Sequence, residues 1–96
     1  MTMLAVHPGR ILKRGLEARD MSVNKLALAL RLPSSRIVDI LNAKRGISPD
    51  TALRLGRYFG NSPQFWLNLQ TAYELSVAER EVGERIAAEV TPADAA

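Results

Sequence analysis

The chain has 96 residues, of which 47% are hydrophobic and 24% are charged, and its formal net charge is +3. This length fits one domain with one modest core. The absence of cysteine excludes disulfides and thiolate chemistry, and the single histidine, His7, lacks the partners of a zinc site or a Ser-His-Asp triad. We therefore expect no enzymatic activity, no metal and no cofactor.

Hydropathy predicts a protein without a membrane partner. No apolar run reaches the roughly 18 to 20 residues that cross a bilayer. The first six residues, which we treat as an N-terminal extension, lack the long apolar core of a secretory signal. A cytoplasmic location is the expectation that follows.

Charge is distributed unevenly along the chain. Residues 1–60 hold 11 Lys and Arg against four carboxylates, a net charge of +7, whereas residues 61–96 carry −4. Such asymmetry indicates that the basic segment faces a polyanion and that the acidic segment faces a different partner. A solvated imbalance without functional meaning is the simpler alternative.

Helical spacing predicts short helices and no strand in the first half of the chain. A first helix begins at Pro8, where a missing N–H is harmless, and continues to Asp20. Ser22 is a good N-cap for a second helix that ends near Arg31, and a third begins at Pro33 and Ser34.

The second half repeats the same signals. Ser48-Pro49 and Ser62-Pro63 predict the starts of a fourth and a fifth helix, and Gly46 and Gly60 predict helix stops. Ser76-Val-Ala-Glu79 resembles a capping box, which predicts a separate C-terminal helix over 76–90 after a domain over 7–75. Residues 91–96 are predicted to be a disordered tail.

The third helix has one apolar face and one free face. At about 100° per residue, Ile37, Ile40 and Leu41 share a stripe that belongs in a core. The opposite and flanking positions hold small, polar or charged side chains: Ser34, Ser35, Arg36, Val38, Asp39 and Asn42. Small side chains on an exposed helix allow it to approach another surface closely.

The short turn before this helix fits a helix-turn-helix, whose second helix enters the DNA major groove with its N-terminus first. Arg36 can fork onto guanine, Asn42 can pair with adenine, and Asp39 can accept from cytosine or orient Arg36. Lys44 and Arg45 can reach phosphates. A solvated Ser-Ser-Arg helix start is the alternative, but the preceding helix and the basic charge together favour DNA binding.

Two stripes remain in the acidic half. Phe65, Trp66, Leu69 and Tyr73 recur at helical spacing, which is typical of a core and also compatible with a dimer interface. Val82, Ile86 and Val90 form a narrow stripe that fits either a helix seam or packing onto the same domain. The predicted dimer interface comprises Phe65, Trp66, Leu69, Val82 and Ile86. His7 is expected to pack or to cap a helix.

From His7 to about Val90 the sequence resembles the HigA/VapI antitoxins, a branch of the Xre helix-turn-helix proteins. The most specific pieces are His7-Pro8-Gly9, RGISPDTA at 45–52 and SPQFWLNLQ at 62–70. The resemblance implies an all-α, five-helix lambda-repressor-like bundle. It also implies a dimer that represses its own operon at operator double-stranded DNA and neutralises a HigB/RelE-like ribonuclease toxin.

Two positions depart from the wider Xre pattern. Val23 replaces a glutamine that contacts phosphate in many Xre proteins, so Asn24 and Lys25 are the expected anchors. Arg31 replaces a common glycine, and a left-handed backbone there would cost about 1 kcal/mol. The predicted DNA contacts are Asn24, Lys25, Ser34, Ser35, Arg36, Val38, Asp39, Asn42, Lys44 and Arg45.

Two other functions stay open. A regulator of the same fold would bind DNA without any toxin. The presence or absence of a toxin-like reading frame beside the gene distinguishes an antitoxin from such a regulator. A bundle that binds only proteins would have no affinity for duplex DNA at low salt.

Overall fold

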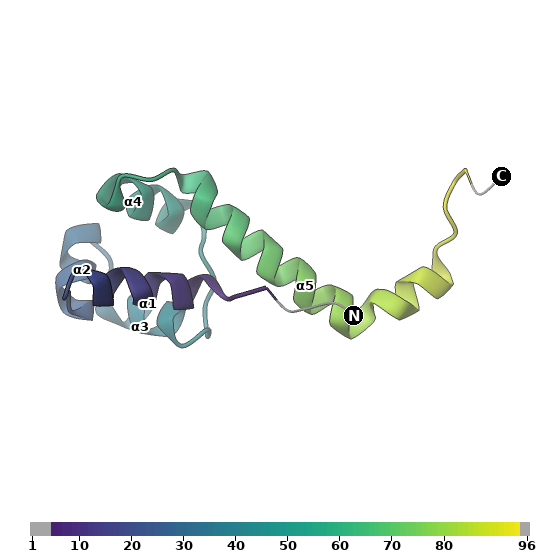
Figure 1. The fold of residues 1–96 in the computed structure, drawn as a ribbon, viewed down its shortest axis with the longest axis horizontal. Helices are drawn as coiled ribbons and strands as arrows, with labels where there is room; N and C mark the ends of the chain where they lie inside the picture. Colours follow the sequence, from purple (N-terminus) through teal and green to yellow (C-terminus); the bar gives the residue numbers. More distant parts are fainter. Residues whose placement is uncertain (1–4, 95–96) are drawn as a thin grey trace.

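The computed structural model describes residues 5–94, and within them the chain is all helical (Figure 1). The elements are α1 (Pro8–Ala18), α2 (Val23–Leu30), α3 (Ser34–Leu41), α4 (Pro49–Phe59) and α5 (Pro63–Glu89). The predicted all-α class is confirmed. The first four residues of the predicted extension and the last two of the predicted tail lie outside the described residues, whereas residues 91–94 follow α5 without helix and are exposed.

The helices begin where the sequence predicts. In α2, α4 and α5 a serine is the N-cap, and its hydroxyl oxygen accepts the backbone N–H three residues later at 3.1 to 3.2 Å. In α1 the N-cap is His7, whose Nδ1 accepts the N–H of Gly9 at 2.9 Å. These acceptors satisfy N–H groups that a helix start leaves without an intrahelical partner.

The core lies where α1 to α4 meet the beginning of α5. Contacts join α4 to α5, α2 to α3, α1 to α3, α1 to α5 and α2 to α4. Side chains from all five helices and the loop before α4 fill this space: Leu12, Leu16, Leu26, Ala27, Leu30, Ile37, Ile40, Ile47, Ala52, Leu55 and Trp66. The buried face of α3 therefore holds that helix against the bundle.

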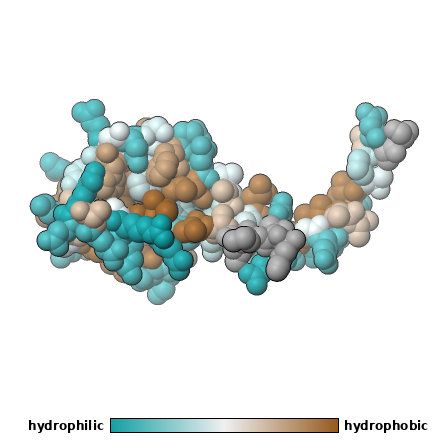
Figure 2. Space-filling view, in the orientation of Figure 1, coloured by the Kyte–Doolittle hydropathy of each residue, from teal (hydrophilic) through white to brown (hydrophobic). Residues whose placement is uncertain are grey.

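α5 extends far beyond this bundle (Figure 1). Its 27 residues span about 40 Å, and the molecule measures 56 × 21 × 21 Å. Hydrophobic residues recur along the projecting part (Figure 2). Although α5 is long enough to cross a bilayer, no helix among the described residues is apolar enough to do so.

The predicted break before a separate helix over 76–90 is wrong, because α5 continues through Ser76. The Ser76 hydroxyl donates to the carbonyl oxygen of Tyr73 at 2.8 Å and accepts the N–H of Ala5 at 3.1 Å. A serine that bonds back to the preceding turn is tolerated inside a helix. The bond to Ala5 also holds the start of the described chain beside α5.

One of the two predicted helix stops is correct. Gly60 caps α4 with a left-handed φ of 76°. Gly46 does not end α3, which stops at Leu41, and the left-handed residue after it is Ala43 with φ 59°. Similarly, α1 ends at Ala18, before the predicted end at Asp20, which is itself left-handed with φ 51°.

Candidate nucleic-acid interface

The turn between α2 and α3 has the length that the predicted helix-turn-helix requires. Arg31 caps α2 in the left-handed region with φ 59° and ψ 43°, and the N–H of Leu32 bonds to the carbonyl oxygen of Ala27 at 3.0 Å. The backbone at Arg31 is therefore left-handed, the case in which an arginine costs about 1 kcal/mol. Three residues separate the helices, so α3 lies directly against α2.

α3 divides into the two predicted faces. Ile37 and Ile40 have no exposed surface, and Leu41 is half-buried. Ser34, Ser35, Val38 and Asn42 are exposed, whereas Arg36 and Asp39 are half-buried at the margins. The predicted groove-facing side chains therefore lie on the outer surface of a helix whose inner face is fixed in the core.

The start of α3 differs in detail from the other helix starts. Ser34 is the first residue of the helix, as predicted, but the N-cap position belongs to Pro33 and no side chain caps the helix. The backbone N–H groups of the first turn are therefore not satisfied by a capping side chain. Such groups at an exposed helix start are donors for a phosphate oxygen.

Asp39 contributes to this surface through its backbone. Its carbonyl oxygen accepts the N–H groups of Lys44 at 2.8 Å and Arg45 at 3.2 Å. The ion pairs of the described residues are Arg54 with Asp50 and Arg85 with Glu89, so the Asp39 carboxylate does not pair with Arg36 here. The carboxylate is therefore not held in place by the arginine that it was considered to orient.

The proposed anchors on α2 lie beside the start of α3. Asn24 and Lys25 occupy the exposed first turn of α2, whereas Val23 packs against the core. A groove of about 350 Å³ is lined by Asn24, Ala27, Leu28, Leu32 and Ser34. Asn24 and Ser34 therefore face one space, and the 77% exposed Leu28 is part of its wall.

One supporting contact was not predicted from the sequence. The Arg54 guanidinium on α4 donates to the carbonyl oxygen of Leu30 at 2.9 Å and to the Asp50 carboxylate at 2.7 Å. The first bond satisfies a carbonyl at the end of α2, where the turn begins. No local signal marks it, because the two residues are 24 positions apart.

The predicted dimer residues fall into two groups. Phe65 is exposed and Leu69 half-buried near the bundle, whereas Val82 and Ile86 lie on the projecting part of α5. Trp66 is wrong as an interface residue, because only 3% of it is exposed and its Nε1 donates to the Asn61 Oδ1 at 2.9 Å within the same domain. It is a core residue, the alternative that the aromatic spacing left open.

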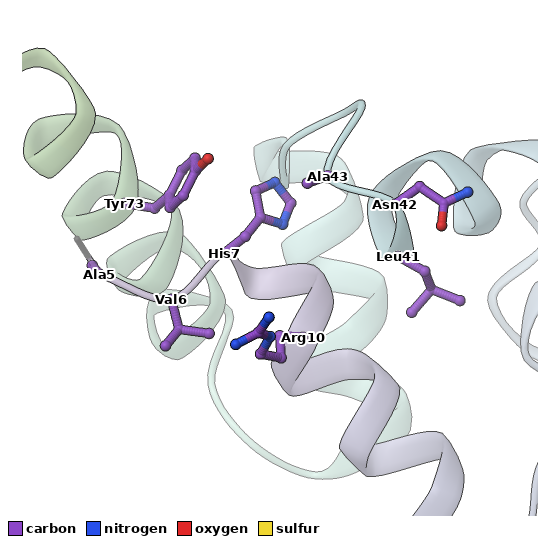
Figure 3. Close-up of a pocket in the computed structure, with 8 residues that line it drawn as sticks. All are labelled: Ala5, Val6, His7, Arg10, Leu41, Asn42, Ala43 and Tyr73. Carbon is purple, nitrogen blue, oxygen red and sulfur yellow. The ribbon is translucent and has the colours of Figure 1, made fainter. Parts of the chain in front are cut away.

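His7 lies in a pocket of about 420 Å³ between α1, the end of α3 and α5 (Figure 3). Its ring meets Tyr73 edge to face with centroids 4.9 Å apart. Partial burial lowers the pKa of His7 below the usual 6.5. Since Nδ1 must be unprotonated to accept the Gly9 N–H, the lowered pKa agrees with its role as a cap, which was one of the two expectations for this residue.

Among residues 5–94, no group of three or more His, Cys, Asp or Glu is placed to hold a metal ion. What the described surface offers is a helix edge with hydrogen-bonding side chains, followed by two cations in the loop after it.

Comparison with known proteins gives the family. The helix-turn-helix family model matches residues 12–66. Virulence-associated protein I of Dichelobacter nodosus is 51% identical over 80 residues, covering 82% of this chain and 74% of that protein.

Solved structures extend the likeness over nearly the whole chain. An addiction module antidote protein of the HigA family from Coxiella burnetii is 49% identical with a TM-score of 0.92, covering 94% of this chain and 99% of that one. The Pseudomonas aeruginosa antitoxin HigA, solved with the higBA promoter, is 45% identical with a TM-score of 0.89, covering 92% and 97%. These relatives are helix-turn-helix proteins rather than enzymes. The chain therefore belongs to the Xre-type helix-turn-helix family, in the branch of the HigA and VapI antitoxins.

Proposed function

We propose that this chain is a cytoplasmic antitoxin that represses its own operon by binding operator DNA as a dimer and that neutralises a HigB/RelE-like ribonuclease. The observation that carries the DNA-binding part is the exposed edge of α3, which begins at Ser34 and is followed by Lys44 and Arg45. The likeness to an antitoxin solved with its promoter supports the same conclusion.

The side chains of this surface divide into two roles. Arg36 stands in the first turn of α3, the part of a recognition helix that meets base edges, and its guanidinium can donate two bonds to guanine. Lys44 lies beyond the helix in an exposed loop and is suited to a phosphate. Asn24 and Lys25 at the start of α2 are suited to phosphates on the other side of the groove.

These roles leave different signatures. Arg36→Ala should weaken binding to the cognate operator by about 1 to 3 kcal/mol and relax preference at one base pair. Lys44→Ala should weaken binding to all duplexes alike and reduce the slope of log K against log salt by about 1.

Competition titrations at several salt concentrations, on operator and random duplexes, measure both effects. Arg85→Ala, which removes an equal charge from the far part of α5, is the control and should change neither. Equal losses on both duplexes for the Arg36 variant would show that it does not read a base.

Support for a dimer comes from the projecting part of α5. One helix in one groove makes few contacts, so two copies about one helical turn (roughly 10 base pairs) apart are expected. Ile86 and Val90 are 49% and 63% exposed, and Val82 lies on the same stripe. Apolar side chains repeated along a free helix are suited to a seam with a second helix.

Sedimentation tests this seam. Val82→Glu/Ile86→Glu should shift the dimer to monomer, because two carboxylates would be buried unpaired in it. Ala88→Glu, on the opposite side of the helix at 100° per residue, is the control and should stay dimeric. A double variant that remains a dimer of unchanged affinity, with its helix content intact by circular dichroism, removes this stripe from the interface.

The toxin partner is tested by co-expression. A short reading frame beside the gene should be toxic alone and harmless with this chain, and the two products should purify together. If no neighbouring frame is toxic while operator binding persists, the chain is a stand-alone Xre-type regulator.

A further inference from the structure

The side chain of Gln70 links α5 to the loop between α3 and α4. Its Oε1 accepts the backbone N–H of Ile47 at 2.8 Å, across 23 positions of sequence. Ile47 belongs to the core and is almost fully buried. Without Gln70 this N–H would lose its partner at the edge of the core, where an unpaired donor is costly.

The neighbouring glycine is explained by this contact. A Cβ at Gly46 would lie 2.6 to 2.7 Å from the amide atoms of Gln70, so a side chain there would push this amide out of its place. Gly46 does not have a positive φ; among described glycines only Gly60 does. Glycine at 46 therefore leaves room for the Gln70 amide in its bonded position, whereas the local backbone does not call for glycine.

The loop is held at both ends. At its start, the N–H groups of Lys44 and Arg45 bond to the carbonyl oxygen of Asp39 on α3. At its end, Ile47 bonds to Gln70 on α5. Lys44 and Arg45, whose side chains are exposed, stand at the first attachment, and only Gly46 separates them from the second at Ile47. The path of the backbone that carries both cations therefore depends on the bond to Asp39 and on the bond to Gln70.

We propose that Gln70 is a positioning residue for DNA binding: it fixes the loop whose cations contact phosphate, and it does so from α5, the helix that extends beyond the bundle. The inference rests on the DNA binding proposed above. Gln70 acts through Lys44 and Arg45 and itself touches no base or phosphate, so its removal should affect sequence-independent affinity and leave the preference of Arg36 unchanged.

The test uses Gln70→Met, which keeps the length of the side chain and removes the acceptor. Gln64→Met is the matched control, because the same change on the exposed first turns of α5 breaks only a bond to Asn68. Affinities for operator and random duplexes are measured across a salt series. Each substitution is also made in a Lys44→Ala/Arg45→Ala background, and helix content is checked by circular dichroism.

We expect Gln70→Met to weaken binding roughly three- to tenfold on both duplexes and to reduce the salt slope, while Gln64→Met does neither. In the background without Lys44 and Arg45, Gln70→Met should cause no further loss, because the groups through which it acts are gone. A loss of the same size in that background, or a loss on the operator alone, overturns the proposal. Wild-type affinity and slope for Gln70→Met also overturn it, whereas a wild-type chain that binds no duplex at low salt refutes the DNA binding itself.

Discussion

Gly9, at the start of α1, is the position where one added methyl group should do most damage. An ideal Cβ on Gly9 would collide with the carbonyl oxygen of Ile40 and lie 2.9 Å from its carbonyl carbon. Both obstacles are backbone atoms of α3, so no rotamer change can make room. Gly9→Ala therefore requires α1 to move away from the helix proposed to read DNA.

The size of the effect follows from two opposed contributions. Overpacking a buried contact costs about 1 to 3 kcal/mol, and a collision with backbone belongs at the upper end. Replacing glycine by alanine in a helix recovers about 0.5 to 1 kcal/mol. A net loss of about 2 kcal/mol lowers the melting temperature of a domain of this size by roughly 8 to 16 °C.

Gly15→Ala on the same helix is the control. A Cβ there meets only ring atoms of Phe59 at 3.9 Å, an ordinary contact, so this variant should melt a few degrees higher than wild type. Thermal unfolding followed by circular dichroism compares the two. If Gly9→Ala melts at or above the wild-type temperature, the close approach of α1 and α3 does not constrain this position.

Two further predictions concern local hydrogen bonds. Burial lowers the pKa of His7, so as the pH falls the unfolded chain binds a proton at this residue before the folded chain does. The free energy of unfolding should therefore decrease as the pH falls through 6.5. In urea unfolding, this part of the decrease should vanish in His7→Asn, which retains a capping oxygen. Gly46→Ala should displace the Gln70 amide from Ile47 and cost about 1 to 3 kcal/mol in wild type. In a Gln70→Ala background, Gly46→Ala should lower the free energy of unfolding only slightly. An equal loss in the wild-type and Gln70→Ala backgrounds would show that the Gln70 contact does not determine the effect.

The features that the sequence predicted correctly depend on neighbouring residues. A serine followed by proline specifies a helix start by itself, which is why Ser48 and Ser62 were identified without any knowledge of the fold. The two faces of α3 follow from the spacing of Ile37 and Ile40 alone. A surface that lies on one helix and the loop after it can therefore be predicted from the sequence.

Features that join distant segments could not be predicted. Nothing in the SPQFWLNLQ motif at 62–70 indicates that the Gln70 amide reaches Ile47. Similarly, no sequence pattern indicates that Arg54 bonds to Leu30. Ala43 adopts a left-handed backbone that its residue type does not favour. Each of these follows from tertiary packing, since the partner is chosen by how the helices lie against one another.

The error at Ser76 has a physical cause with a functional consequence. A capping box specifies a helix start when the chain enters it from a non-helical segment, but no glycine or proline interrupts residues 64–82 and Tyr73 is already helical. The Ser76 hydroxyl then bonds to the preceding turn and to Ala5 instead of capping. Because α5 has no break there, Gln70 and the apolar stripe near Ile86 belong to one continuous helix. A partner that binds the stripe therefore holds the same helix that fixes the loop of Lys44 and Arg45.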